Sequence, residues 1–332
     1  SLLARPNTNP TTDSPETVRC ILDKAKNADA RVYVAASVTK GLKSEEPTDL
    51  DALRKAGAVG LSDDGRPVVN TAYLRNAMNR APKLGMTVVA HCEDLFLADG
   101  GKINEGEISA QLGVKGIPAA AEDCGTAREI ALAAADNVPI HICHVSTATS
   151  VELIRDAKRR GVQVTAETAP HYFSLTEKEL LKRDADYRMN PPLRTQADVA
   201  AIIEGLTDGT LDCIATDHAP HSAEEKSKGL EKSAFGITGI ETAFPVLYTH
   251  LVRNNIITLE KLMELMVVNP SKRFDIPVDF KNSFTVWDLN CEFTVNPDEF
   301  LSKGRATPFE GEKLFGKCVL TAVNGKTVYS NI

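Results

Sequence analysis

The sequence lacks the features that mark several broad classes of protein. Its seven cysteines are scattered and include no Cys-x-x-Cys pair, which argues against a disulfide framework and favours reduced thiols in the cytoplasm. No apolar run approaches the ~20 residues that a membrane span needs. The start of the chain has no basic segment followed by an apolar core, so we expect no signal peptide. The net charge is -7 without a long basic run, which argues against nucleic acid as a partner.

What is present describes an ordinary globular chain. The 332 residues are 42% hydrophobic and 25% charged, as in a typical folded domain. The chain begins inside the apolar run 1–4, which we interpret as the tail of a strand. We therefore expect one or more strands to begin before Ser1. Arg5 follows this run, and an arginine at a buried strand end needs a partner.

Apolar strand-like runs alternate with amphipathic helical segments over most of the chain. The predicted strands are 1–4, 31–36, 58–61, 86–90, 138–143, 162–166 and 213–215. The predicted helices are 14–28, 50–56, 72–84, 120–135, 150–160, 196–206, 241–254 and 259–268, the last ended by Asn269 and Pro270. This alternation indicates parallel strands joined by helical crossovers. The fold class predicted is α/β, a (β/α)8 TIM-type barrel.

The pattern changes after about Asp275. Residues 283–289, 318–323 and 326–329 read as short strands, and Asn324-Gly325 as a tight hairpin turn. We therefore divide the chain into a barrel over 1–275, with its first strand incomplete, and a small β-sandwich-like unit over 276–332.

Polar side chains stand where four of the predicted strands end. They are Asp64, His91, His144 and Asp217, and barrel active sites lie at the carboxyl ends of the strands. Two imidazoles and two carboxylates suit zinc, although cobalt or manganese could replace it. Zinc lowers the pKa of its water to about 7 and polarises a carbonyl group. Asp217 could take the proton of that water and pass it to a leaving nitrogen, so the sequence predicts hydrolysis of an amide or imide.

The other histidines are less informative. His141 stops short of its strand end and is interpreted as a core residue, and His250 as a helix surface residue. His171 follows a strand end beside Pro170, and both a structural and a functional role stay open.

Six motifs together resemble those of dihydroorotases of the longer bacterial form, within the amidohydrolase superfamily. The motifs are residues 6–10, 62–65, 91–94, 144–146, 190–194 and 216–221. The family also carries a His-x-His and an arginine upstream of Asn7, which agrees with a first strand before Ser1.

The resemblance implies specific roles. His91 and His144 resemble the histidines that hold one zinc ion, and Asp64, chosen over Asp63 for its spacing from His91, resembles the carboxylate that bridges two metals. Asp217 resembles the metal-bound general acid and base, and the family implies one or two Zn²⁺ per chain. The residues that resemble substrate contacts are Asn7, Asn190, His221, Phe235 and Gly236. The polar loop 222–233 lies where the family has a mobile segment.

The leading hypothesis is a cytoplasmic, zinc-dependent dihydroorotase of pyrimidine biosynthesis. It would convert N-carbamoyl-L-aspartate reversibly to L-dihydroorotate, and we expect a homodimer. One alternative is a catalytically silent dihydroorotase-like partner of aspartate transcarbamoylase. Another is a hydantoinase or allantoinase, although those relatives carry a carbamylated lysine where this chain has Asp64.

Overall fold

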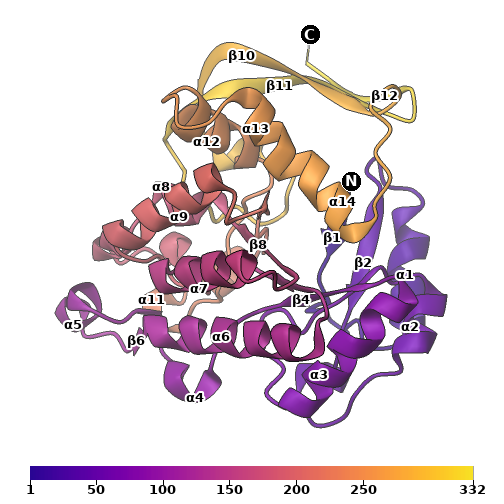
Figure 1. Ribbon diagram of the computed structural model, residues 1–332. Helices are drawn as coiled ribbons and strands as arrows, with labels where there is room; N and C mark the ends of the chain where they lie inside the picture. The colour runs from indigo at the N-terminus through magenta and orange to yellow at the C-terminus, as the bar shows by residue number, and fades with distance from the viewer. Residues whose placement is uncertain (332) are drawn as a thin grey trace.

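The computed structural model describes residues 1–331, so residue 332 of the predicted C-terminal unit lies outside the described part. Seven parallel strands form one curved sheet in the order β1-β2-β3-β4-β7-β8-β9 (Figure 1). Their bounds are β1 Leu2–Ala4, β2 Val32–Ala36, β3 Gly60–Leu61, β4 Thr87–Ala90, β7 Ile140–Ile142, β8 Val164–Thr168 and β9 Cys213–Ile214. All seven predicted strands are confirmed. β3, β4, β7 and β9 are fully buried, whereas β1 at the edge of the sheet has an exposed Leu2.

Helices connect the strands. The α-helices are α1 Pro15–Ala25, α2 Leu50–Ala56, α3 Thr71–Arg80, α4 Leu95–Ala98, α5 Glu107–Leu112, α6 Ala119–Asp136, α7 Ala148–Arg159, α8 Pro170–Ser174, α9 Gln196–Asp208, α10 Ala223–Lys226, α11 Gly229–Lys232, α12 Ala243–Leu247, α13 Leu259–Met263 and α14 Asn269–Phe274. The 3-10 turns are η1 Lys40–Leu42, η2 Ala81–Leu84, η3 Glu177–Lys182, η4 Ala185–Tyr187 and η7 Pro297–Glu299, and the π-helices are η5 Tyr248–Val252 and η6 Glu264–Val268. A two-stranded pair, β5 Ile103–Asn104 and β6 Gly116–Ile117, lies outside the main sheet.

One predicted helix end is wrong. The helix expected to stop at Asn269 and Pro270 continues through η6 into α14 and ends at Phe274. Pro270 stands in the first turn of α14, directly after the π-helical turn η6. The chain then leaves the helix at Asp275, which has a left-handed φ of 50°.

The C-terminal segment forms one three-stranded antiparallel sheet. Its strands are β10 Phe284–Thr294, β11 Lys313–Val323 and β12 Lys326–Ser330. Asn324 and Gly325 have φ values of 51° and 78°, as a two-residue hairpin turn requires. β11 packs on α12, and the Trp287 ring lies 4.0 Å from that of Phe244. We propose that this sheet is the small unit after about residue 275.

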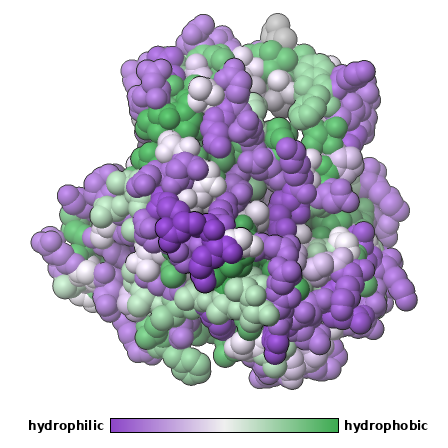
Figure 2. Space-filling model, viewed as in Figure 1, coloured by the Kyte–Doolittle hydropathy of each residue, from purple (hydrophilic) through white to green (hydrophobic). Residues whose placement is uncertain are grey.

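The face drawn in Figure 2 is mainly hydrophilic, with apolar side chains gathered at its lower edge, near α4 of Figure 1. Leu95, Phe96 and Leu97 of that helix are exposed. Within residues 1–331, no helix combines the length and the hydropathy that crossing a membrane requires.

The Asp136 carboxylate joins helices α3 and α6, and we expect it to make the stability of the protein depend on pH. Arg75 of α3 donates two hydrogen bonds of 2.6 Å to Asp136 at the end of α6, and Asn79 donates a third. The Arg75 and Asn79 hydrogen bonds lower the pKa of Asp136 to about 2. Because the folded pKa lies below the unfolded value of about 3.9, this stabilisation is complete above pH 4 and is lost as the pH falls toward 2.

We therefore expect Asp136→Asn to be less stable than the wild type at pH 6. The difference in free energy of unfolding should shrink at pH 3, as urea titrations at both pH values would measure. A difference of equal size at the two pH values would contradict the assignment.

Candidate active site

Polar side chains from five parallel strands meet at one edge of the sheet. His91 follows β4 directly, His144 follows β7, and Asp64 and Asp217 follow β3 and β9 within three residues. His171 lies in α8, just after β8. Because the strands are parallel, their carboxyl ends share that edge, where barrel active sites lie.

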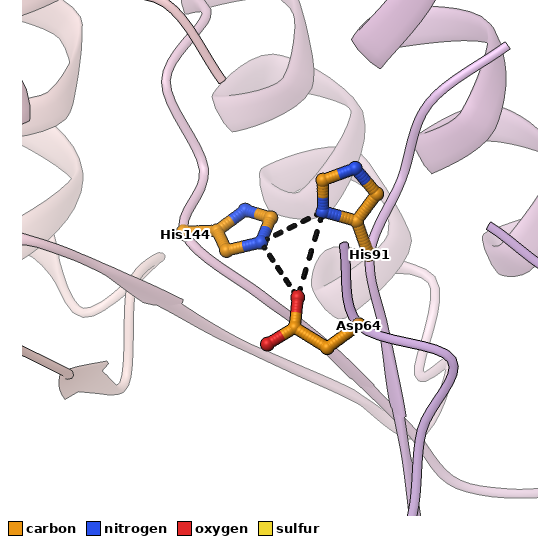
Figure 3. Close-up of side chains that lie close together, drawn as sticks. All are labelled: Asp64, His91 and His144. Carbon is orange, nitrogen blue, oxygen red and sulfur yellow. Dashed lines mark hydrogen bonds and ion pairs between the residues drawn. The ribbon is translucent and has the colours of Figure 1, made fainter. Parts of the chain in front are cut away.

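Three of these side chains form a compact cluster, which Figure 3 shows. His91 Nδ1 lies 2.9 Å from His144 Nε2. Asp64 Oδ1 lies 3.3 Å from His144 Nε2 and 3.6 Å from His91 Nδ1. All three residues are buried. Among the described residues, this is the group of histidine, cysteine and acidic side chains whose atoms converge closely enough to hold a metal ion.

The cluster fits a small divalent cation. Zinc–ligand bonds of about 2.0–2.1 Å in a tetrahedron put neighbouring ligand atoms about 3.3–3.4 Å apart, and the three separations of 2.9, 3.3 and 3.6 Å bracket that spacing. Two imidazole nitrogens that face each other also need a shared proton or a cation between them. The donor set and its spacing are therefore those of a metal site.

The electrostatics of the cluster favour a positive charge at its centre. Burial alone would raise the pKa of Asp64, but the His144 hydrogen bond and the Arg5 charge hold it below its ordinary value. Burial likewise opposes protonation of His144, yet the Asp64 hydrogen bond and the Asp217 charge raise the pKa of His144 to about 9. A divalent cation would take the place of that proton.

Asp63 and Asp64 have different tasks. Asp63 accepts hydrogen bonds from the backbone N–H groups of Val38 and Thr39, at 2.6 and 3.2 Å, and from the Thr39 hydroxyl. It therefore fastens the loop after β2, and Asp64 is the residue that reaches the cluster.

Backbone strain accompanies the site. His144 and Asp217 have left-handed φ values of 33° and 47°, which residues other than glycine seldom adopt. Such conformations concentrate at functional sites.

Asp217 stands outside the three-residue cluster. Its side chain is 23% exposed, and its Oδ2 atom lies 3.8 Å from His171 Nε2. Burial raises the pKa of Asp217, against the lowering effect of His144. His218 next to it is turned away, because its Nδ1 accepts hydrogen bonds from the N–H groups of Gly239 and Ile240.

The residues expected to contact substrate lie around the same edge but do not all converge. Asn7 is exposed near Gly65, and Asn190 is half-buried beside Glu93. His221 Nε2 lies 2.9 Å from the Phe235 carbonyl oxygen. A small hollow is lined by residues that include His91, Glu93 and Asn190.

Gly236 shows why that segment carries glycine. Its φ is 128°, and a Cβ atom there would lie 2.6 Å from the Cβ of Ala219. Any side chain would therefore displace the Asp217–His221 loop.

Sequence reasoning missed two buried carboxylates. Glu93 Oε2 lies 3.1 Å from His91 Nε2. Glu167 accepts a 2.6 Å hydrogen bond from Arg5 and lies 3.1 Å from His141 Nε2. Arg5 thus has the partner that its position demands, and His141 is buried as expected. A signal for Glu93 existed, because residues i and i+2 of an extended segment point to the same side.

Lys226 holds the loop that the sequence suggested would be mobile. The loop contains α10 and α11, and Lys226 Nζ donates to the carbonyl oxygens of Arg188, Ala234 and Gly236 at 3.4, 3.2 and 2.9 Å. Lys226 is 7% exposed, so its removal leaves buried carbonyl groups unpaired.

We expect Lys226→Met to increase the hydrogen exchange rate of amides 222–236 by about tenfold or more, since one unpaired buried group costs about 1–3 kcal/mol. The exposed Lys228→Met in the same loop is the matched control. Equal exchange in the two variants would rule out this role for Lys226.

Solved structures with the same architecture include hydantoinases and dihydropyrimidinases. The L-hydantoinase (dihydropyrimidinase) of Arthrobacter aurescens superposes with a TM-score of 0.84 at 25% identity, covering 99% of this chain and 76% of that one. A dihydropyrimidinase from Brevibacillus agri superposes with the same TM-score and the same coverage at 22% identity. An identity that low shows the fold alone. The fold and the buried cluster, together with these relationships, define a cyclic amidohydrolase.

Sequence relatives narrow the assignment. A family model described as "Dihydro-orotase-like" matches residues 1–150. The chain is 47% identical over 334 residues to "Dihydroorotase" of Acetivibrio thermocellus, covering 99% of this chain and 78% of that protein. It is 45% identical over 335 residues to "Dihydroorotase" of Geobacillus thermodenitrificans, with the same coverage. The chain belongs to the dihydroorotase family.

Proposed function

We propose that this chain is a zinc-dependent dihydroorotase that interconverts N-carbamoyl-L-aspartate and L-dihydroorotate in the cytoplasm. The observation that carries the proposal is the buried Asp64–His91–His144 cluster at the carboxyl edge of the sheet. The seven free cysteines support a reducing compartment.

Asp64, His91 and His144 would hold the metal, with Asp217 beside them. When bound, zinc polarises a carbonyl group and makes a water molecule more acidic. His91 presents Nδ1 to the cluster, and its Nε2 atom lies 3.1 Å from Glu93 on the other side of the ring. Arg5, paired with Glu167, lies 3.7 Å from Asp64 Oδ2 and helps to keep that carboxylate ionised.

Asp217 is the proposed general base and acid. In the hydrolytic direction its carboxylate takes a proton from the attacking water while a C–O bond forms at the ring carbonyl carbon. The ring C–N bond then breaks, and Asp217 passes that proton to the leaving nitrogen. A raised pKa suits this exchange, because a base is most effective when its pKa approaches the working pH.

Asn7, Asn190 and His221 are proposed to bind the substrate. Amide side chains offer both donors and acceptors to a planar ring, and an imidazole can donate a hydrogen bond to a substrate carboxylate. The His221 contact with Phe235 supports a substrate-binding role for the backbone of Phe235 and Gly236, because it joins the two segments.

The purified protein supplied with zinc should hydrolyse L-dihydroorotate, measured as the formation of N-carbamoyl-L-aspartate. The structural neighbours favour hydantoinase activity as the second candidate, so hydantoin and dihydrouracil should be assayed in parallel. Faster turnover of either compound than of L-dihydroorotate would overturn the proposal.

A further inference from the structure

Glu93 is a buried carboxylate that links two parts of the site. It is 8% exposed. Its Oε2 atom lies 3.1 Å from Nε2 of His91, and both of its oxygens lie 3.3 Å from Nδ2 of Asn190. His91 follows β4, whereas Asn190 comes from the loop before α9. One side chain therefore contacts a residue of the metal cluster and a residue proposed to bind substrate.

The contact with His91 decides which nitrogen of the imidazole ring carries the proton. His91 Nδ1 faces the cluster, so Nε2 points to the opposite side and meets the carboxylate. An ionised carboxylate only accepts hydrogen bonds, so the proton of the neutral ring must be on Nε2. The Nδ1 lone pair is then free for a metal ion, as in the carboxylate–histidine–metal arrangement.

The contact with Asn190 decides the orientation of the amide. Because the Glu93 oxygens can only accept, the Asn190 group that faces them must be the Nδ2 amino group. The Asn190 Oδ1 atom therefore points elsewhere and is the atom left to a ligand. A carbonyl acceptor at that place suits a ring N–H group, such as the cyclic amide substrate of the proposed function carries.

The position of Glu93 is tightly fixed. Gly125 of α6 packs against the backbone at residues 92 and 93, where a Cβ atom would lie 2.7 Å from the nitrogen of Glu93. Packing against α6 thus fixes the backbone at Glu93, and the two partners fix its carboxylate.

We propose that Glu93 is a positioning residue that holds His91 in its metal-binding tautomer and turns the Asn190 amide oxygen toward a substrate N–H group. The Asn190 half of this proposal rests on the proposed function, and the His91 half does not. The two halves predict different measurements, so one set of variants separates them.

We expect Glu93→Ala to weaken zinc binding by about 10–100-fold, the usual effect of losing such a partner, and to raise KM for L-dihydroorotate. Glu93→Gln should separate the effects. Its amide oxygen can still accept from His91, so zinc affinity should stay within about threefold of the wild type. Its amino group would replace one of the two oxygens that accept from Nδ2 of Asn190 and would set donor against donor. KM should therefore rise by up to about tenfold, the cost of one lost hydrogen bond.

The experiment measures the zinc dissociation constant by chelator competition, and kcat and KM with zinc saturating. Asn190→Ala should raise KM and leave zinc affinity unchanged. In the double variant Glu93→Ala/Asn190→Ala, KM should not exceed that of Asn190→Ala, because both changes remove the same contact. Glu312→Gln is the matched control, since Glu312 pairs with His250 at 2.7 Å outside the cluster.

Two results would overturn the proposal. One is a folded Glu93→Ala variant with wild-type zinc affinity, and the other is multiplication of the Glu93→Ala and Asn190→Ala effects on KM. If the wild type does not turn over L-dihydroorotate, the proposed function fails and the Asn190 half fails with it. The zinc affinities of Glu93→Ala and Glu93→Gln then decide the His91 half alone.

Discussion

Asp217→Asn is expected to reduce kcat for L-dihydroorotate hydrolysis by about 10²–10⁴-fold, the usual contribution of a general acid or base. Asparagine has nearly the volume of aspartate but cannot accept and return the proton. The three residues of the metal cluster are untouched by this change, so the metal should stay bound. Asp217→Ala should abolish turnover as well.

Steady-state kinetics together with the metal content of each purified variant test this prediction. Asp136→Asn is the matched control, because it removes the same charge from the outer helices. An Asp217→Asn variant with kcat within tenfold of the wild type would exclude the general-base role. Loss of activity together with loss of the metal would indicate that the main role of Asp217 is to bind the metal.

His144→Ala should remove the metal and, with it, the activity. The His144 imidazole touches both other members of the cluster, at 2.9 and 3.3 Å. Loss of a partner that merely orients a ligand already weakens metal binding by about 10–100-fold, so loss of the ligand itself should cost more than about 100-fold. The zinc content after dialysis should fall from near one or two ions per chain toward zero.

Elemental analysis of dialysed protein, beside His250→Gln as control, checks this prediction. Retention of zinc by His144→Ala would refute the cluster as the metal site. The wild-type value also bears on the alternative of a silent partner of aspartate transcarbamoylase. A silent barrel has no need of a buried metal, so little zinc in the wild-type protein would favour it.

The evidence for hydantoinase activity comes mainly from the similarity of the fold. The superposed hydantoinases are at most 25% identical to this chain, whereas the dihydroorotases reach 47%. Binding of one cyclic amide rather than another depends on a few side chains around the ring, which fold similarity does not determine. Substrate competition assays are therefore the appropriate test.

Strands and most helices could be predicted from local pattern. The cap at Ser14, which accepts a hydrogen bond from the N–H of Thr17, and the hairpin at Asn324 and Gly325 both follow from short-range chemistry. The continuation of the helix past Pro270 could not be predicted, because a π-helical turn, which leaves no clear sequence signal, precedes it.

The sequence by itself determined the alternation of strands and helices, the placing of polar residues after strand ends, and the family. Those features depend on periodicity and on short motifs, which are local. The resemblance already favoured Asp64 over Asp63, but only the tertiary structure decided that Asp63 turns to Val38 and how Asp64 meets His144. It also decided the partners of Glu93, because that pairing joins residues 97 positions apart. Contacts of that range depend on how the strands lie side by side, and no local pattern encodes them.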